Sequence, residues 1–177
     1  MTLATRLATA AAVLPLTLAG PASAGQLDRG HAELADAVDA AGVTLLINPP
    51  EICDQEDAPM GLYSGTHKLM VVCQDNRVAG SEKVVTWTAN DLDTLRHEAH
   101  HLIQDCVDGS LDGELESVYR EPVRLAYEVL GVRGIRSIVK AYDEAPDHIV
   151  LLELEAFSVA AMDDTAEQVA DVGRFCF

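Results

Sequence analysis

The feature that most constrains this chain is the run of residues 94–106, TLRHEAHHLIQDC, which contains the pattern H-E-x-x-H at His97, Glu98 and His101. Residues four apart on an α-helix lie one above the other, so the two imidazoles can hold one metal ion. Glu98 projects beside them, where a carboxylate can act as a base towards water. The run therefore predicts a helix that carries two zinc ligands.

The residues around this motif favour a helix. Asn90 is a good N-cap, and Asp91 and Asp93 suit the positive end of a helix dipole. Apolar residues also recur with helical spacing, at Leu92, Leu95, Ala99, Leu102 and Ile103. An apparent strand at residues 84–88 precedes this helix. Such a strand would place an extended ligand beside the metal.

The amino terminus has the pattern of a secretory signal. Arg6 is followed by the apolar run of residues 7–18 and then by Ala22-Ser23-Ala24, the small-x-small pattern that signal peptidase reads. We therefore expect residues 1–24 to be a signal peptide and residues 25–177 to form one domain. No later stretch has the roughly 20 apolar residues of a membrane-spanning helix. We expect a secreted or periplasmic protein.

The charge of the remaining chain limits its partners. Without Arg6, 11 basic residues stand against 29 acidic ones, which is a net charge of −18. This charge repels phosphate backbones and anionic lipids, and so argues against nucleic-acid and membrane partners. A peptide or protein substrate is the expected partner, and the sequence does not predict an oligomeric state.

Four cysteines in an exported chain favour two disulfides, for which three pairings are possible. Pairing Cys53 with Cys73 would close a local loop. Cys106 and Cys176 would then tie the end of the chain to the end of the motif helix. A zinc site built from all four thiolates is disfavoured because no C-x-x-C spacing occurs.

The order of the predicted elements indicates an α+β fold. We expect a helix at residues 32–41, a strand at 43–47, a loop at 51–59, a hairpin from 61–63 and 68–73, and a strand at 83–88. The pattern after Gly113 is helical, with segments at residues 114–130, 135–142 and 148–162 and a tail ending near Gly173. The predicted architecture is a small, mostly antiparallel sheet, then the motif helix and a C-terminal helical half.

The motif needs a third ligand, because a catalytic zinc usually has three protein ligands and one open position. A histidine six residues after His101 is excluded, since that position is Val107. The apolar helix at residues 151–162 offers two glutamates, and a buried carboxylate is costly unless it is paired or binds metal. Glu155 falls among apolar side chains on a helical wheel and is the preferred ligand. Glu153 is the alternative.

With these residues the chain resembles the gluzincin type of zinc metallopeptidase, in which H-E-x-x-H on one helix is completed by a glutamate on another. The run Glu153-Leu-Glu-Ala156 is also similar to the Glu-x-Glu-Ala run of the ImmA/IrrE-like peptidases. The resemblance implies that His97 and His101 bind zinc and that Glu98 is the base. Many gluzincins carry an Asp or Asn four residues after the glutamate, where this chain has Phe157 or Val159.

Other polar residues are candidates for the surroundings of the metal. Asp105 could hydrogen-bond a ligand histidine, although a solvated helix end suits it better. His100 lies off the ligand face, as a supporting or surface residue. The sequence does not choose an oxyanion donor among the tyrosines Tyr119, Tyr127 and Tyr142.

The function expected from these residues is hydrolysis of a peptide bond. Zinc would polarise the carbonyl and its water, while Glu98 takes a proton and passes it to the leaving amine. The strand at residues 83–88 could hold an extended substrate by edge pairing. Two alternatives remain open: a non-catalytic secreted domain with a structural zinc, and a metal-free domain with surface histidines.

Overall fold

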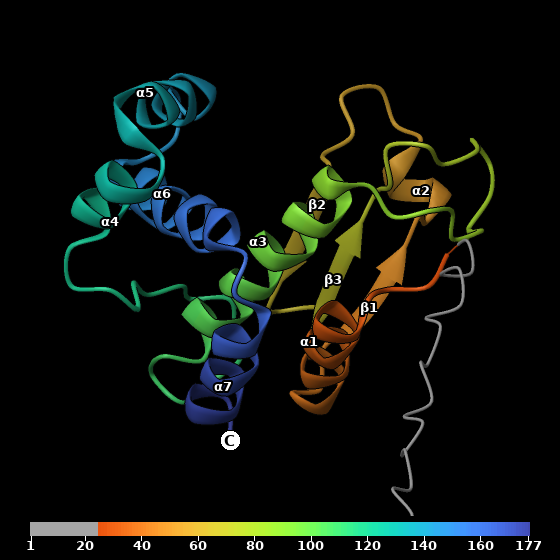
Figure 1. Ribbon diagram of the computed structural model, residues 1–177, viewed down its shortest axis with the longest axis horizontal. Helices are drawn as coiled ribbons and strands as arrows, with labels where there is room; N and C mark the ends of the chain where they lie inside the picture. Colours follow the sequence, from red (N-terminus) through yellow and green to blue (C-terminus); the bar gives the residue numbers. More distant parts are fainter. Residues whose placement is uncertain (1–24) are drawn as a thin grey trace, which may run out of the picture.

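The computed structural model describes residues 25–177, and the predicted signal peptide at residues 1–24 lies outside them. The described chain has the predicted α+β fold, with seven helices and a three-stranded sheet. The motif helix α3 (Ala89–Asp105) runs through the middle of the molecule. The sheet lies on one side of it, and most of the C-terminal helices lie on the other (Figure 1).

The amino-terminal half supplies the sheet. After α1 (Arg29–Ala40) and β1 (Thr44–Ile47), a short helix α2 (Pro50–Cys53) lies where the sequence indicated a loop. β2 (Gly61–Ser64) and β3 (Leu69–Val72) form the predicted hairpin. β3 is central and pairs in parallel with β1, so the sheet is mixed rather than mostly antiparallel. Parallel strands need a long connection, and here α2 and β2 lie between β1 and β3 in the chain and provide it.

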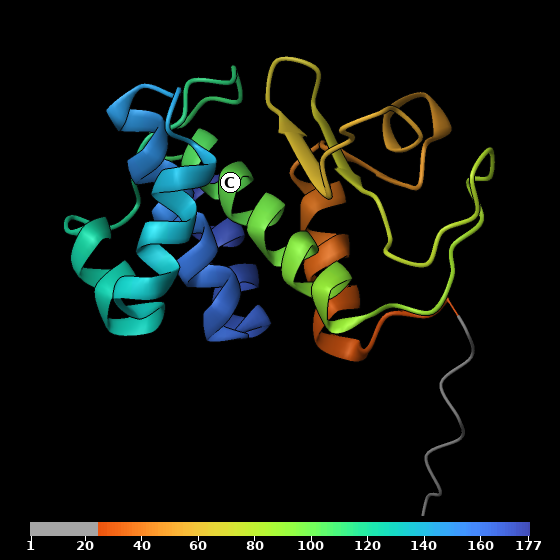
Figure 2. The same ribbon diagram turned by 90° about the horizontal axis from the view of Figure 1, so that it is seen from above.

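The alternation of side chains along β3 divides the core. Met70 and Val72 face a cluster built from α1, α3 and α7, whereas Val71 packs with Cys53 and Cys73 on the other face. All three β3 side chains are fully buried. Figure 2 shows α1 and α3 against the same side of the strands. The motif helix is therefore fixed against the sheet by apolar packing.

The strand predicted at residues 83–88 is absent from the described chain, and this prediction is wrong. The segment has no strand partner because buried side-chain amides bind its backbone instead. Gln74 donates to the carbonyl of Val85 and accepts from its N–H, and Asn48 donates to the carbonyl of Lys83. These bonds satisfy an extended segment without adding it to the sheet.

Helix α3 begins with a capping box whose N-cap is Thr88, two residues earlier than the predicted cap at Asn90. The Thr88 hydroxyl accepts from the N–H of Asp91, and the Asp91 carboxylate accepts from the N–H of Thr88. Two free donors at the helix start are thereby satisfied. Asn90 instead donates to Asp75. The first turn is anchored well before His97.

The C-terminal half is helical, with bounds that differ from the predicted ones. Its helices are α4 (Pro122–Val129), α5 (Gly131–Ala141), α6 (Asp147–Met162) and α7 (Thr165–Phe175). Residues 114–121, predicted to be helical, are not, because backbone N–H groups of this segment bind the Glu155 carboxylate on α6. Within residues 25–177 no helix combines the length and apolar character needed to cross a membrane.

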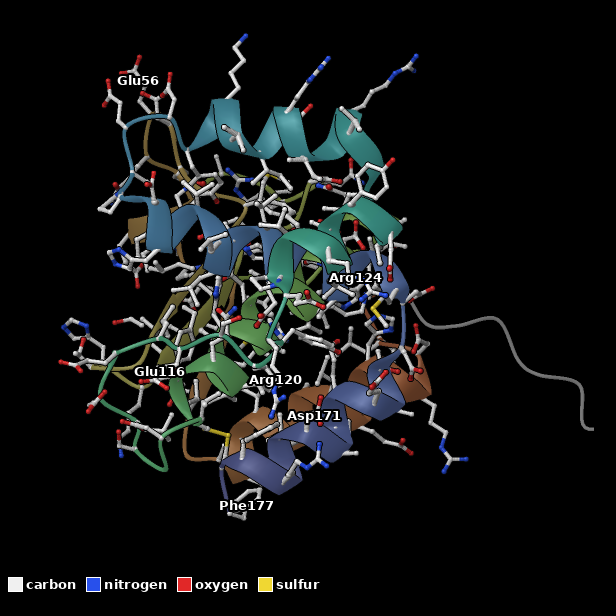
Figure 3. All side chains as sticks on the ribbon, turned by 90° about the vertical axis from the view of Figure 1, so that its left-hand side faces the viewer. Glu56, Glu116, Arg120, Arg124, Asp171 and Phe177 are labelled. Atoms are coloured by element: carbon white, nitrogen blue, oxygen red, sulfur yellow. A yellow bond between two sulfur atoms is a disulfide. The ribbon has the colours of Figure 1, made fainter. Side chains whose placement is uncertain are left out.

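Both predicted disulfides are confirmed. Cys53 is bonded to Cys73, and Cys106 at the end of α3 is bonded to Cys176 near the chain end. Phe177, labelled in Figure 3, lies next to the second of these bonds. The second disulfide therefore joins the last residues of the chain to the helix that carries the motif.

We predict that the two disulfides stabilise the protein unequally. They close loops of 70 and 20 residues, and the loop-entropy relation assigns about 4 and about 3 kcal/mol to loops of these lengths. Replacing Cys106 and Cys176 with alanine should thus lower the free energy of unfolding more than replacing Cys53 and Cys73. Urea unfolding of both double variants measures this order, and the reverse order would contradict it.

Candidate metal centre

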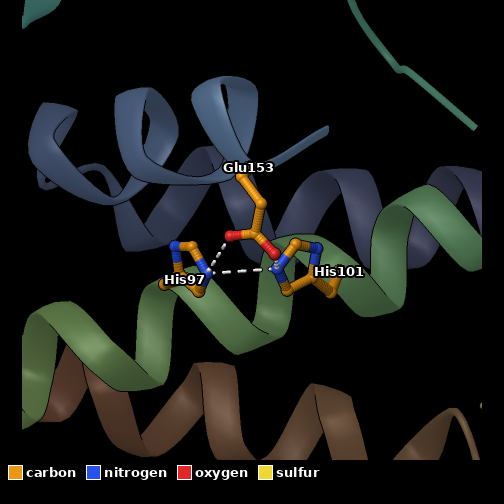
Figure 4. A group of neighbouring side chains, drawn as sticks. All are labelled: His97, His101 and Glu153. Carbon is orange, nitrogen blue, oxygen red and sulfur yellow. Dashed lines mark hydrogen bonds and ion pairs between the residues drawn. The ribbon is translucent and has the colours of Figure 1, made fainter. Parts of the chain in front are cut away.

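Three side chains from two helices converge at the centre of the molecule. His97 and His101 lie one turn apart on α3, and Glu153 reaches them from α6 (Figure 4). The two Nε2 atoms are 3.1 Å apart. Glu153 places Oε2 3.2 Å from Nε2 of His97 and Oε1 3.5 Å from Nε2 of His101.

These separations fit a tetrahedral metal. With metal–ligand bonds of about 2.0–2.1 Å, two ligands of tetrahedral zinc are about 3.4 Å apart. The two imidazole nitrogens and the Glu153 carboxylate, which approaches each ring with a different oxygen, therefore form a triangle that suits one face of such a site, and the fourth position is left for another ligand. Two imidazoles and one carboxylate are also a ligand set that zinc accepts.

The burial of these three side chains also suits a bound cation. The side chains of His97, His101 and Glu153 are only 10%, 8% and 14% exposed. Nδ1 of His97 is buried without a hydrogen-bond partner among the described residues. A buried carboxylate is expensive unless it is paired or coordinates a cation. The local arrangement suits a bound divalent ion.

The electrostatics of the three groups favour an ionised Glu153 and affect the two histidines in opposite directions. Burial opposes ionisation of Glu153, but hydrogen bonds and charge from the two histidines hold the pKa of its carboxyl well below the usual range. Burial lowers the pKa of His97 despite the nearby carboxylate. For His101 the attraction of Glu153 outweighs burial, and its pKa is raised.

The geometry places Glu153, the alternative third ligand of the sequence analysis, beside the paired imidazoles, and it gives Glu155, the preferred one, other partners. Its carboxylate accepts from Nε2 of His100 at 2.8 Å, from Nε2 of Gln104 at 3.0 Å, and from backbone and side-chain donors of residues 117–119. Residues two apart on a helix point in nearly opposite directions, so Glu153 faces the paired imidazoles when Glu155 faces away. Burial of Glu155 was correctly expected, but hydrogen bonds account for it.

The hydrogen-bond partner of His101 also differs from the expected one, Asp105. Asp105 accepts from the Tyr63 hydroxyl at 2.5 Å and from the N–H groups of Asp112 and Gly113, so it supports a loop rather than a ligand. The ring of His101 instead contacts Gln104, whose Oε1 is 2.7 Å from Nδ1. The sequence analysis missed Gln104, although its position three residues after His101 places it on the adjoining helix face.

Glu98 lies beside the three candidate ligands and is not one of them. It is 6% exposed, and burial raises the pKa of its carboxyl to about 7. With His97 it lines a cavity of about 330 Å³. The remaining lining residues are Pro59, Met60, Gly61, Asn90, Asp93, Thr94, Tyr142, Phe157 and Ala160. The cavity has largely apolar walls, and its lining includes the carboxylates of Asp93 and Glu98.

Two aromatic residues complete the wall of this cavity. The Phe157 ring, one turn after Glu153 on α6, packs on the His97 ring with 4.3 Å between centroids. Tyr142 is half-buried, and burial together with the charge of Glu153 raises the pKa of its hydroxyl. Of the three candidate tyrosines, Tyr142 is the one that lines the cavity with Glu98.

No protein-family model, curated protein or solved structure matches this chain. The functional interpretation therefore depends on the side chains of the site and on their geometry.

We predict that the two glutamates of α6 have separable effects. Glu153→Gln should weaken zinc binding by more than the roughly 10–100-fold that loss of a supporting partner costs, because it changes a ligand. Glu155→Gln should retain zinc affinity within about tenfold but lower the free energy of unfolding by about 2–3 kcal/mol, since a charged acceptor of several hydrogen bonds is lost. Chelator competition measures the zinc affinity, and urea unfolding of the metal-free protein measures the stability. A greater loss of zinc affinity in Glu155→Gln than in Glu153→Gln would contradict the assignment.

Proposed function

We propose that the chain is a zinc-dependent metallopeptidase that hydrolyses peptide bonds. One observation carries this proposal: a triangle of His97, His101 and Glu153 donors at tetrahedral spacing borders a cavity that also contains Glu98. Zinc bound there would supply a Lewis acid that polarises a carbonyl and lowers the pKa of water from 15.7 to about 7. The protein residues supply the remaining steps.

Glu98 is proposed as the general base. It follows His97 directly in the chain, is buried, and shares the cavity with it while remaining free of the ligand triangle. A carboxylate in this place can accept the proton of the attacking water and later donate it to the leaving amine. Exclusion of bulk water by the apolar walls strengthens these charge interactions.

Tyr142 is proposed as the donor to the carbonyl oxygen of the substrate. Its hydroxyl lies at the wall of the cavity near Glu153, and its raised pKa keeps it protonated at neutral pH. A fixed O–H donor stabilises the negative charge that develops on this oxygen. Tyr127 is 62% exposed on α4, and Tyr119 adjoins His100, so neither lines this cavity.

The substrate would lie along β2, rather than along residues 83–88. β2 is an edge strand of the sheet, and α3 packs beside it. The Cys73 N–H donates to the carbonyl of Met60, so by antiparallel alternation the backbone groups of Gly61 and Tyr63 point away from β3. An extended peptide could pair with this free edge. Gly61 also lines the cavity that contains Glu98.

A secreted or periplasmic location is part of the proposal. Two disulfides are typical of proteins that fold in an oxidising compartment. The signal-like pattern at the start of the sequence supports the same location. Peptides or unfolded proteins outside the cytosol are the corresponding substrates.

We predict that Glu98→Gln separates binding from turnover. The amide cannot accept the proton, so hydrolysis of an unfolded protein substrate should fall by about 10²–10⁴-fold. The zinc content should stay at one per chain because the ligand triangle is intact. Peptide release and elemental analysis measure the two properties. A zinc-loaded wild type that neither hydrolyses peptides nor binds a hydroxamate would instead favour the structural-zinc alternative.

We also predict that a side chain at position 61 displaces Glu98. A Cβ built on Gly61 would lie 2.6 Å from Cγ2 of Thr94 and closer still to Oε1 of Glu98. Gly61→Ala should therefore lower turnover by up to about 100-fold, the cost of a displacement near 1 Å, with zinc content unchanged. Gly173→Ala is the matched control, because its Cβ meets no atom within 4 Å. Equal turnover of the two variants would refute this role of Gly61.

A further inference from the structure

The amide of Gln104 joins the two helices that carry the metal ligands. Gln104 is fully buried near the end of α3. Its Oε1 lies 2.7 Å from Nδ1 of His101, and its Nε2 donates to the carbonyl of Leu152 at 3.1 Å and to Oε1 of Glu155 at 3.0 Å. Leu152 and Glu155 flank Glu153 on α6. One side chain thus contacts a ligand histidine and the helix of the ligand glutamate.

The orientation of this amide follows from its partners. A backbone carbonyl and a carboxylate accept hydrogen bonds and do not donate them, so the NH₂ group must face Leu152 and Glu155. The amide oxygen consequently faces His101. A neutral imidazole carries one proton, and an oxygen 2.7 Å away holds it on Nδ1. Nε2 of His101 is then left with its lone pair directed towards Glu153 and His97.

The alternative position of the proton would block the site. Nε2 of His101 lies 3.1 Å from Nε2 of His97 and 3.5 Å from Oε1 of Glu153, and both compete for the same proton. A proton on Nε2 would occupy the lone pair that a metal needs. Gln104 has the shorter contact, which favours the tautomer that can bind metal. His97 lacks such a partner, because its Nδ1 is buried without a hydrogen bond and its ring packs on Phe157.

We propose that Gln104 is a positioning residue that holds His101 in the Nδ1–H tautomer and aligns it with the helix of Glu153. The proposal deepens the proposed function, since it assigns the residue that prepares the metal ligand. Gln104 does not touch a substrate or the reacting atoms. Its effect reaches the metal through the ring of His101.

Nitrogen NMR of the metal-free protein tests the tautomer directly. Long-range ¹H–¹⁵N spectra, recorded at a pH where titration shows the rings to be neutral, should show His101 protonated at Nδ1 in the wild type. In Gln104→Met the proton should move towards Nε2, because Nδ1 has lost its acceptor while Nε2 still faces His97 at 3.1 Å and Glu153 at 3.5 Å. A wild-type His101 that is protonated mainly at Nε2 would overturn the proposal, even if the variant does not fold.

Zinc affinity supplies the second measurement. Gln104→Met should bind zinc about 10–100-fold more weakly than the wild type, the usual cost of removing a partner of a ligand histidine. Gln168→Met is the matched control: Gln168 is also buried and binds α3 through the carbonyl of Arg96, but it contacts neither ligand. Equal zinc affinity of Gln104→Met and Gln168→Met would overturn the proposal. A wild type that binds no zinc would instead refute the proposed function, and the tautomer measurement would still test Gln104.

Discussion

The packing of α6 against α3 is the contact on which the site depends. Gln104 near the end of α3 donates to the carbonyl of Leu152, and Arg96 in the middle of α3 donates to the carbonyl of Ala160 at 2.8 Å. These two bonds hold α6 antiparallel to α3 at both ends of the contact. Glu153 and Phe157 lie between them and meet His101 and His97. Because both acceptors are backbone atoms, the alignment does not require a particular side chain at position 152 or 160.

A buried network surrounds this contact on the side away from the cavity. Glu155 accepts from His100 and Gln104 on α3 and from the backbone of Val118 and Tyr119. The pKa of its carboxyl is lowered to about 2, because these hydrogen bonds outweigh the cost of burial. An ionised carboxylate with this many donors is satisfied without a metal. The pair of glutamates therefore divides two tasks: Glu155 holds the loop and both helices together, and Glu153 faces the imidazoles.

The sequence predicted those features that depend on local spacing. Four-residue spacing placed His97 and His101 on one helix face, and cysteine parity with loop length suggested the observed pairing. Features that depend on distant partners were missed or misplaced. Residues 83–88 have the composition of a strand, but the side-chain amides of Asn48 and Gln74 satisfy their backbone. Likewise, an apolar helical wheel indicates that Glu155 is buried but not which donors surround it, and residues 117–119 are far away in the chain.

The two ends of the ligand triangle differ in a way that suits a catalytic centre. At the His101 end the ring is bound by a buried amide, which is itself tied to α6. At the His97 end the ring contacts Phe157, and Glu98 and the cavity adjoin it. A purely structural metal would gain nothing from a buried base and a cavity beside one ligand, because closed coordination is what stabilises a fold. In the proposed enzyme, rigidity at one end and access at the other would let the same three donors hold an ion and leave a position for a reacting group.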